Sequence, residues 1–285
     1  MDRRIIGLYD EYTHASLDRR VFLERLASLA GGMSAALALV PLLQPNVAAA
    51  AQVPEDDDRL HCRKVDLSND PQGLRGYLAA PRKGKKWPAV LVIHENRGLN
   101  PHVEDVTRRL GIAGYFALAP DFLSALGGTP SDEDQARELI GKLNADQVLS
   151  DAMTAAAWLR DSTESTGHVG AVGFCWGGGL VGRLATADEN LNAAVVFYGR
   201  VPPLEDVSKI KASLLLHYAG LDNRIDADLP AFRKALDDAH VRYQLYMYEN
   251  VDHAFHNDTS AARYNAAAAT LAWQRTLDFF AHNLK

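Results

Sequence analysis

From residue 60 onward, short apolar runs alternate with segments of helical periodicity. The run at 88–93 is continuously apolar, which is typical of a strand buried on both faces of a parallel sheet. Residues 61–67 and 74–78 instead alternate between apolar and polar side chains around a turn-forming segment, which predicts an antiparallel pair. Further strands are predicted at 115–119, 169–174, 193–197, 212–218 and 243–248, and helices at 103–113, 131–143, 147–160, 176–186, 227–240 and 261–283. This alternation predicts a doubly wound, mostly parallel sheet with helices on both faces.

The first fifty residues follow a different pattern. Paired arginines at 19–20 precede Phe-Leu at 22–23, then an apolar stretch at 26–43 and a run of alanines at 48–51. This order is typical of an export signal, and the arginine pair resembles a twin-arginine signal. We therefore expect residues 1–51 to be a signal segment read by the twin-arginine export machinery, although its n-region is unusually long. An amphipathic N-terminal helix or an uncleaved anchor is the alternative.

Composition narrows the class of protein. The chain has 285 residues, of which 47% are hydrophobic and 23% charged, with a net charge of −6. These values are ordinary for a globular protein and argue against a broad nucleic-acid surface. The two cysteines, Cys62 and Cys175, make no disulfide framework, and no cysteine–histidine cluster has zinc-site spacing. We expect residues 52–285 to form a single periplasmic or secreted domain, a monomer or small homo-oligomer without metal or cofactor.

A candidate nucleophile lies between a predicted strand and a predicted helix. Gly173-Phe174-Cys175-Trp176-Gly177 fits the pattern G-x-nucleophile-x-G of a sharp strand-to-helix turn, with cysteine as nucleophile. The dipole of the following helix favours a thiolate at Cys175, and the Trp176 N–H can donate to an oxyanion. The alternative is a buried, structural cysteine in a glycine-rich turn.

An acid and a base follow in the chain order expected after such a turn. Asp222 comes after the strand at 212–218 and a glycine turn, and Asp226 is the rival acid. His253 lies in the loop after the strand at 243–248, where its imidazole can reach a thiol, and His256 is the rival base. We favour Asp222 and His253, and expect most other histidines to lie at the surface.

The loop after the first buried strand supplies further candidates. It reads His-Glu-Asn-Arg-Gly at 94–98. In this topology the loop provides a second oxyanion donor, which we expect to be the N–H of Asn96. Glu95 and Arg97 are either a solvated rim or charges that face the nucleophile.

Taken together, these motifs resemble the dienelactone hydrolase family. The resemblance rests on Gly-Phe-Cys-Trp-Gly-Gly at 173–178, Gly-Leu-Asp at 220–222, Asp-His-Ala-Phe at 252–255 and the loop at 94–98, and it covers roughly residues 60–282. It implies an α/β-hydrolase fold, a Cys-His-Asp triad that needs no metal, and enol-lactones as substrates. It also implies that Glu95 modulates the thiol, and that Arg137 or Arg97 binds the substrate carboxylate.

The function predicted from these residues is hydrolysis of a small ester or (enol-)lactone. Cys175 would form a thioester acyl-enzyme, which His253 and Asp222 would help water to cleave. A general carboxylesterase, a thiol redox or stress protein on a hydrolase scaffold, and a non-catalytic binding scaffold are the alternatives.

Overall fold

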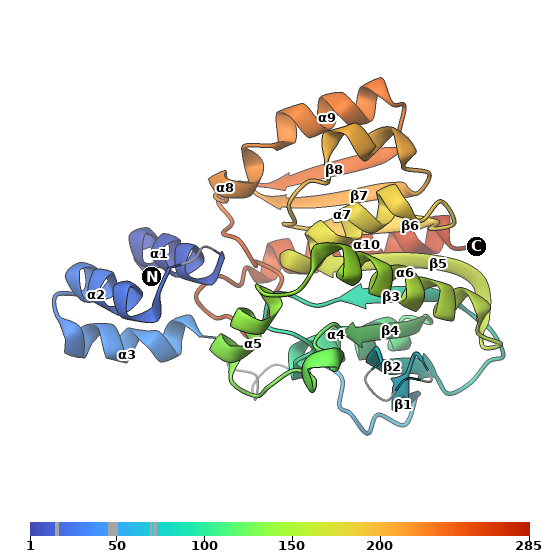
Figure 1. Cartoon of the computed structure of the whole chain (residues 1–285), viewed down its shortest axis with the longest axis horizontal. Helices are drawn as coiled ribbons and strands as arrows, with labels where there is room; N and C mark the ends of the chain where they lie inside the picture. Colours follow the sequence, from blue (N-terminus) through green and yellow to red (C-terminus); the bar gives the residue numbers. More distant parts are fainter. Residues whose placement is uncertain (15–16, 45–50, 69, 71–72) are drawn as a thin grey trace.

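An eight-stranded sheet runs through the molecule (Figure 1). The computed structural model describes residues 1–14, 17–44, 51–68, 70 and 73–285. The strand order is β1-β2-β4-β3-β5-β6-β7-β8. The first three strands in this order pair antiparallel, and every later neighbour pairs parallel. The strands are β1 (Leu60–Asp66), β2 (Arg75–Pro81), β3 (Trp87–Ile93), β4 (Phe116–Asp121), β5 (Ser165–Phe174), β6 (Ala193–Phe197), β7 (Ser213–Ala219) and β8 (Tyr243–Tyr248).

Helices cover both faces of this sheet. An apolar core beneath α6, α7 and α9 fills one face, and a second core beneath α4 and α10 fills the other. The helices of the domain are α4 (Pro101–Ile112), α5 (Glu133–Ile140), α6 (Ala145–Asp161), α7 (Trp176–Ala187), α8 (Asn223–Asp226), α9 (Leu229–Asp238) and α10 (Ala266–Asn283), with 3-10 turns η2 (Ser124–Leu126) and η3 (Leu204–Lys209). The predicted α/β-hydrolase fold, with a mostly parallel sheet between two helical layers, is confirmed.

Two predicted helices have different limits in the structure. The helix expected at 227–240 is the shorter α9, at Leu229–Asp238, with Pro230 in its first turn, where a missing N–H costs nothing, and α8 precedes it as a separate short helix. The helix expected from residue 261 begins five residues later, at Ala266. Asn265 caps it by accepting a hydrogen bond from the Ala268 N–H, which fixes the start.

The N-terminal residues fold as three helices beside the carboxyl edge of the sheet. They are α1 (Arg3–His14), α2 (Arg19–Ala30) and α3 (Met33–Leu43), drawn in blue in Figure 1. They have a small apolar cluster of their own, to which the main domain adds Ala262. Among the described residues no single helix is long and apolar enough to cross a membrane, while α2 and α3 pass that test only as a pair bent by 109°. The export signal and its cleavage stay predictions, and part of the alanine run at 48–51 lies outside the described residues.

Candidate active site

The turn between β5 and α7 holds Cys175 in an unusual backbone conformation. Its φ is 53° and its ψ is −114°, a strained combination for a side chain with a Cβ. A Cβ on Gly173 would lie 2.2 Å from the Gly177 carbonyl oxygen, and one on Gly177 would lie 2.4 Å from two backbone oxygens of the β3 end. The two glycines therefore let this turn close, and Cys175 projects from the sheet edge as the motif predicts.

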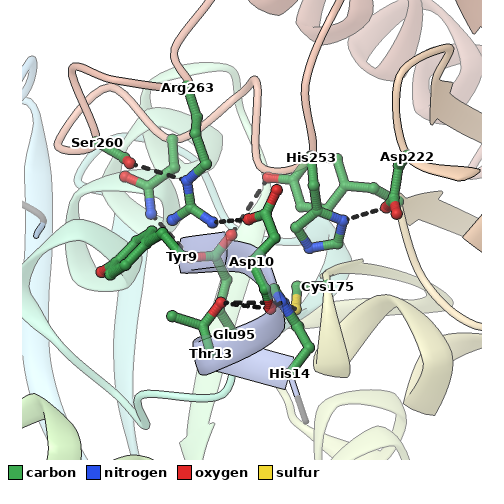
Figure 2. A network of polar contacts seen from close by, with 12 residues as sticks. Tyr9, Asp10, Thr13, His14, Glu95, Cys175, Asp222, His253, Ser260 and Arg263 are labelled. Carbon is green, nitrogen blue, oxygen red and sulfur yellow. Dashed lines mark hydrogen bonds and ion pairs between the residues drawn. The ribbon is translucent and has the colours of Figure 1, made fainter. Parts of the chain in front are cut away.

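The loops after β7 and β8 bring Asp222 and His253 together. The Nδ1–H of His253 donates to the Asp222 carboxylate, while its Nε2 has no hydrogen-bond partner among the described residues (Figure 2). Both side chains are buried, at 1% and 8% exposure. Burial opposes a charged imidazole, but a Cys175 thiolate and Asp222 together raise the pKa of His253 to about 10. The pair can thus accept and hold a proton from the thiol.

The rival acid and base lie apart from this pair. Asp226 ends α8, and burial together with the charge of Asp222 raises its pKa to about 6. His256 is buried, and its ring stacks on Phe174 and approaches Trp273. Of the other histidines, which we expected to lie mostly at the surface, His94, His102 and His217 are buried, whereas His61, His240 and His282 are exposed.

The thiol itself contacts a residue that the sequence did not indicate. The Nε2 of His14, at the end of α1, lies 3.0 Å from the Cys175 sulfur, within hydrogen-bond distance. The rings of His14 and His253 meet edge to face, with centroids 4.5 Å apart. Figure 2 shows both imidazoles directed toward the sulfur. The unusually long n-region was the one sequence feature that set residues 1–14 apart from an ordinary signal.

The residues predicted to bind the oxyanion or to modulate the thiol, Trp176, Asn96 and Glu95, make different contacts in the structure. Trp176 opens α7 directly after Cys175, so its N–H belongs to the unpaired first turn of that helix. The Asn96 side chain donates to the Thr13 carbonyl at 2.6 Å. Glu95 is buried and accepts hydrogen bonds from Tyr198 and Asn257, so these contacts hold it beside the site. Their roles as oxyanion donors and thiol modulator stay predictions.

Both arginines expected to bind substrate contact α1. Arg97 donates to the Tyr9 hydroxyl at 2.8 Å and pairs with Glu133. Arg137 donates to the Tyr12 carbonyl at 2.5 Å and lies over the ring of Tyr12. Arg137 also lines the cavity beside the thiol, whereas Arg97 is not among the lining residues. Substrate binding by either residue stays a prediction.

A cavity of about 860 Å³ opens beside Cys175 and His253. Its wall includes Thr13 and His14 from α1, so the N-terminal helix borders the cavity. The cavity also contains Arg200, an exposed guanidinium for which no hydrogen bond or ion pair is found within the described part of the chain.

The same convergence could hold a soft metal ion. The Cys175 sulfur and a ring nitrogen of each of His14 and His253 lie within 4.8 Å of one another. This is a donor set that zinc accepts. The proximity of these three side chains also has an explanation without a cation, because Cys175 hydrogen-bonds to His14 and His253 is positioned to accept the thiol proton.

Comparison with known proteins identifies the family. A family model described as the dienelactone hydrolase family matches residues 74–284. The chain belongs to the dienelactone hydrolase family. A carboxymethylenebutenolidase-type protein of Methylorubrum extorquens is 31% identical, with 93% of this chain and 95% of that protein covered. One of Escherichia coli O157:H7 is 30% identical over 84% of this chain and 93% of that protein.

Solved structures of dienelactone hydrolase type share the fold. A dienelactone hydrolase-type protein from Klebsiella pneumoniae superposes with a TM-score of 0.70 at 28% identity, covering 78% of this chain and 98% of that one. A dienelactone hydrolase-like promiscuous phosphotriesterase from metagenomic libraries gives 0.71 at 26% identity, covering 80% and 100%. The prediction of a dienelactone hydrolase-like hydrolase is therefore confirmed.

Proposed function

We propose that this dienelactone hydrolase-like enzyme cleaves a small ester or lactone through Cys175, His253 and Asp222. The observation that carries the proposal is the buried Asp222–His253 pair, whose Nε2 is unpartnered among the described residues and whose imidazole has a ring nitrogen within 4.8 Å of the sulfur of a strained cysteine at a helix N-terminus. The arrangement supplies a nucleophile, a base and a group that orients the base.

The proposed reaction is acyl transfer to water. The thiol proton passes from the sulfur to His253 Nε2, and the sulfur forms a bond to the carbonyl carbon. The resulting oxyanion accepts hydrogen bonds from the Trp176 and Asn96 N–H groups. The leaving oxygen then takes the proton from His253, and a water molecule activated by His253 cleaves the thioester.

The cavity supports a substrate that carries a negative charge. Besides Arg200, three more arginines line it, namely Arg137, Arg183 and Arg224. Arg183 and Arg137 already contact protein groups, whereas Arg200 is available to a ligand carboxylate. We propose a small carboxylate-bearing ester or lactone as substrate class.

The test is hydrolysis of dienelactone, simple lactones and p-nitrophenyl esters by wild type and Cys175→Ala. We expect the substitution to reduce kcat/KM by at least about 10³-fold, because the nucleophile is lost. Carboxylate-bearing substrates should rank above neutral esters of equal size. Activity that survives in Cys175→Ala would refute the proposed mechanism.

A further inference from the structure

Helix α1 places a fourth side chain on the reacting sulfur. We propose that His14 is a further residue of the catalytic site, which accepts a hydrogen bond from the resting Cys175 thiol and holds it protonated. The inference rests on the proposed function, in which Cys175 is the nucleophile. It also makes the N-terminal helix a functional part of the enzyme, and therefore requires that residues 1–51 are retained and not cleaved as a signal.

The hydrogen-bond partners of the His14 ring fix its tautomer. Nδ1 lies 2.9 Å from the Asp10 carbonyl oxygen, which can only accept, and 2.9 Å from the Thr13 hydroxyl, which itself donates to that carbonyl, so Nδ1 carries the proton. In the neutral ring Nε2 is then an acceptor. The Cys175 sulfur, 3.0 Å away, must therefore be the donor, as an S–H group.

The surroundings keep the His14 imidazole neutral. Burial, reinforced by the charged guanidinium groups of Arg224 and Arg263, lowers the pKa of His14 well below its ordinary value. The hydrogen bond to the Asp10 carbonyl favours the charged ring but does not outweigh these effects. His14 is therefore a hydrogen-bond acceptor for the thiol and a poor base, in contrast to His253.

Buried polar contacts hold α1 in place over the site. The buried Arg263 pairs with Asp10 at 2.8 Å (Figure 2). Arg97 donates to the Tyr9 hydroxyl, and Asn96 donates to the Thr13 carbonyl one residue before His14. These groups come from the β3 loop and from the segment before α10, so two parts of the fold that are distant in sequence converge on one helix. Several independent contacts to α1 therefore position His14 next to the Cys175 sulfur.

The chemical consequence is a competition between two imidazoles for one proton. While the thiol donates to His14, its proton is not available to His253, and the sulfur is neutral. When the bond to His14 opens, the S–H bond can break, the proton moves to His253 Nε2, and the electron pair on sulfur becomes the nucleophile. His14 thus lowers the reactivity of the resting thiol, which protects it from oxidants and alkylating agents.

The test compares two substitutions of similar size in the full-length protein. His14→Leu fills the space without an acceptor, whereas His14→Gln keeps a neutral acceptor oxygen. Alkylation of Cys175 by iodoacetamide at pH 7 is followed by the mass of its peptide. We expect about ten-fold faster alkylation in His14→Leu, and a rate within about two-fold of wild type in His14→Gln.

Each outcome decides the matter. Equal rates in all three proteins, or slower alkylation in His14→Leu, would overturn the proposal, the latter by making His14 an activating base. A fast rate in both variants would show that access alone had changed, and would also overturn it. Because alkylation needs no turnover, this result is independent of the hydrolysis test with Cys175→Ala, and thermal melting of both variants verifies folding.

Discussion

Asp222 and Asp226 are four residues apart around one short helix, yet their environments differ. Burial opposes the charge on Asp222, but the hydrogen bond from His253 outweighs it and lowers the pKa of Asp222. Within the described part of the chain Asp226 has no imidazole partner of this kind, and its pKa is raised to about 6. At the scale of single residues, the hydrogen bond from His253 favours the charged form of Asp222, and this carboxylate, not that of Asp226, orients the imidazole.

This difference predicts the effect of two matched substitutions. Asp222→Asn should reduce kcat/KM by about 10²–10⁴-fold, because the amide no longer stabilises the His253 imidazolium and its tautomer. Asp226→Asn should change kcat/KM less than about three-fold. Steady-state kinetics with a p-nitrophenyl ester measures both. A larger loss in Asp226→Asn would show that Asp226, and not Asp222, is the acid that orients His253.

At the scale of elements, the β5–α7 turn depends on close backbone approach. A Cβ on Gly177 would meet the carbonyl oxygens of Ile93 and His94 at 2.4 Å. These are rigid backbone atoms at the end of β3, so α7 or the β3 end must shift to relieve the contact. The same shift would displace Cys175, which couples the stability of this turn to the position of the nucleophile.

Substitution of Gly177 by alanine is therefore expected to destabilise the fold. We expect Gly177→Ala to lower the free energy of unfolding by about 1–3 kcal/mol, the usual result of overpacking. Gly141→Ala is the control, because the nearest atoms to its Cβ are 3.5 Å away and its φ is −64°. Urea unfolding compares the two, and equal losses would contradict the steric argument.

At the scale of the whole molecule, buried neutral histidines set the response to acid. Burial, reinforced by Arg275, lowers the pKa of His217 to about 3. His94 and His256 also have lowered pKa values, mainly because they are buried. Since the unfolded chain binds protons at these rings near pH 6.5 and the folded chain does not, stability is lost as pH falls from about 6.5 toward 3.

His217 offers a direct measurement of this effect. His217→Gln keeps hydrogen-bonding groups for Tyr248 and Thr276 but cannot titrate. We expect the loss of unfolding free energy between pH 7.5 and pH 5 to shrink by about 2 kcal/mol relative to wild type. The exposed His282, replaced in the same way, should leave that loss unchanged. An unchanged loss in His217→Gln would exclude it as an acid-sensitive group.

The sequence by itself determined most of the domain fold and the chain order of the proposed nucleophile, acid and base. Apolar runs specified the central parallel strands because such strands are buried on both faces, and β6 has the predicted limits, as does the more exposed β8 at the end of the sheet. The glycine spacing around Cys175 specified the turn, and Asp222 and His253 followed in order. These features are local, so each can be recognised without knowledge of what packs against it.

Tertiary structure alone decided which distant groups meet at the thiol. His14 lies 161 positions from Cys175, and no local pattern connects them. The burial of His217 and His256, and the contacts of Arg97 and Arg137 with α1, also arise from packing between remote segments. The arginine pair and the apolar stretch near the N-terminus predicted an export signal. The fold adds that the helix preceding them borders the site, because the buried charges of Arg97 and Arg263, from two different loops, find partners on it.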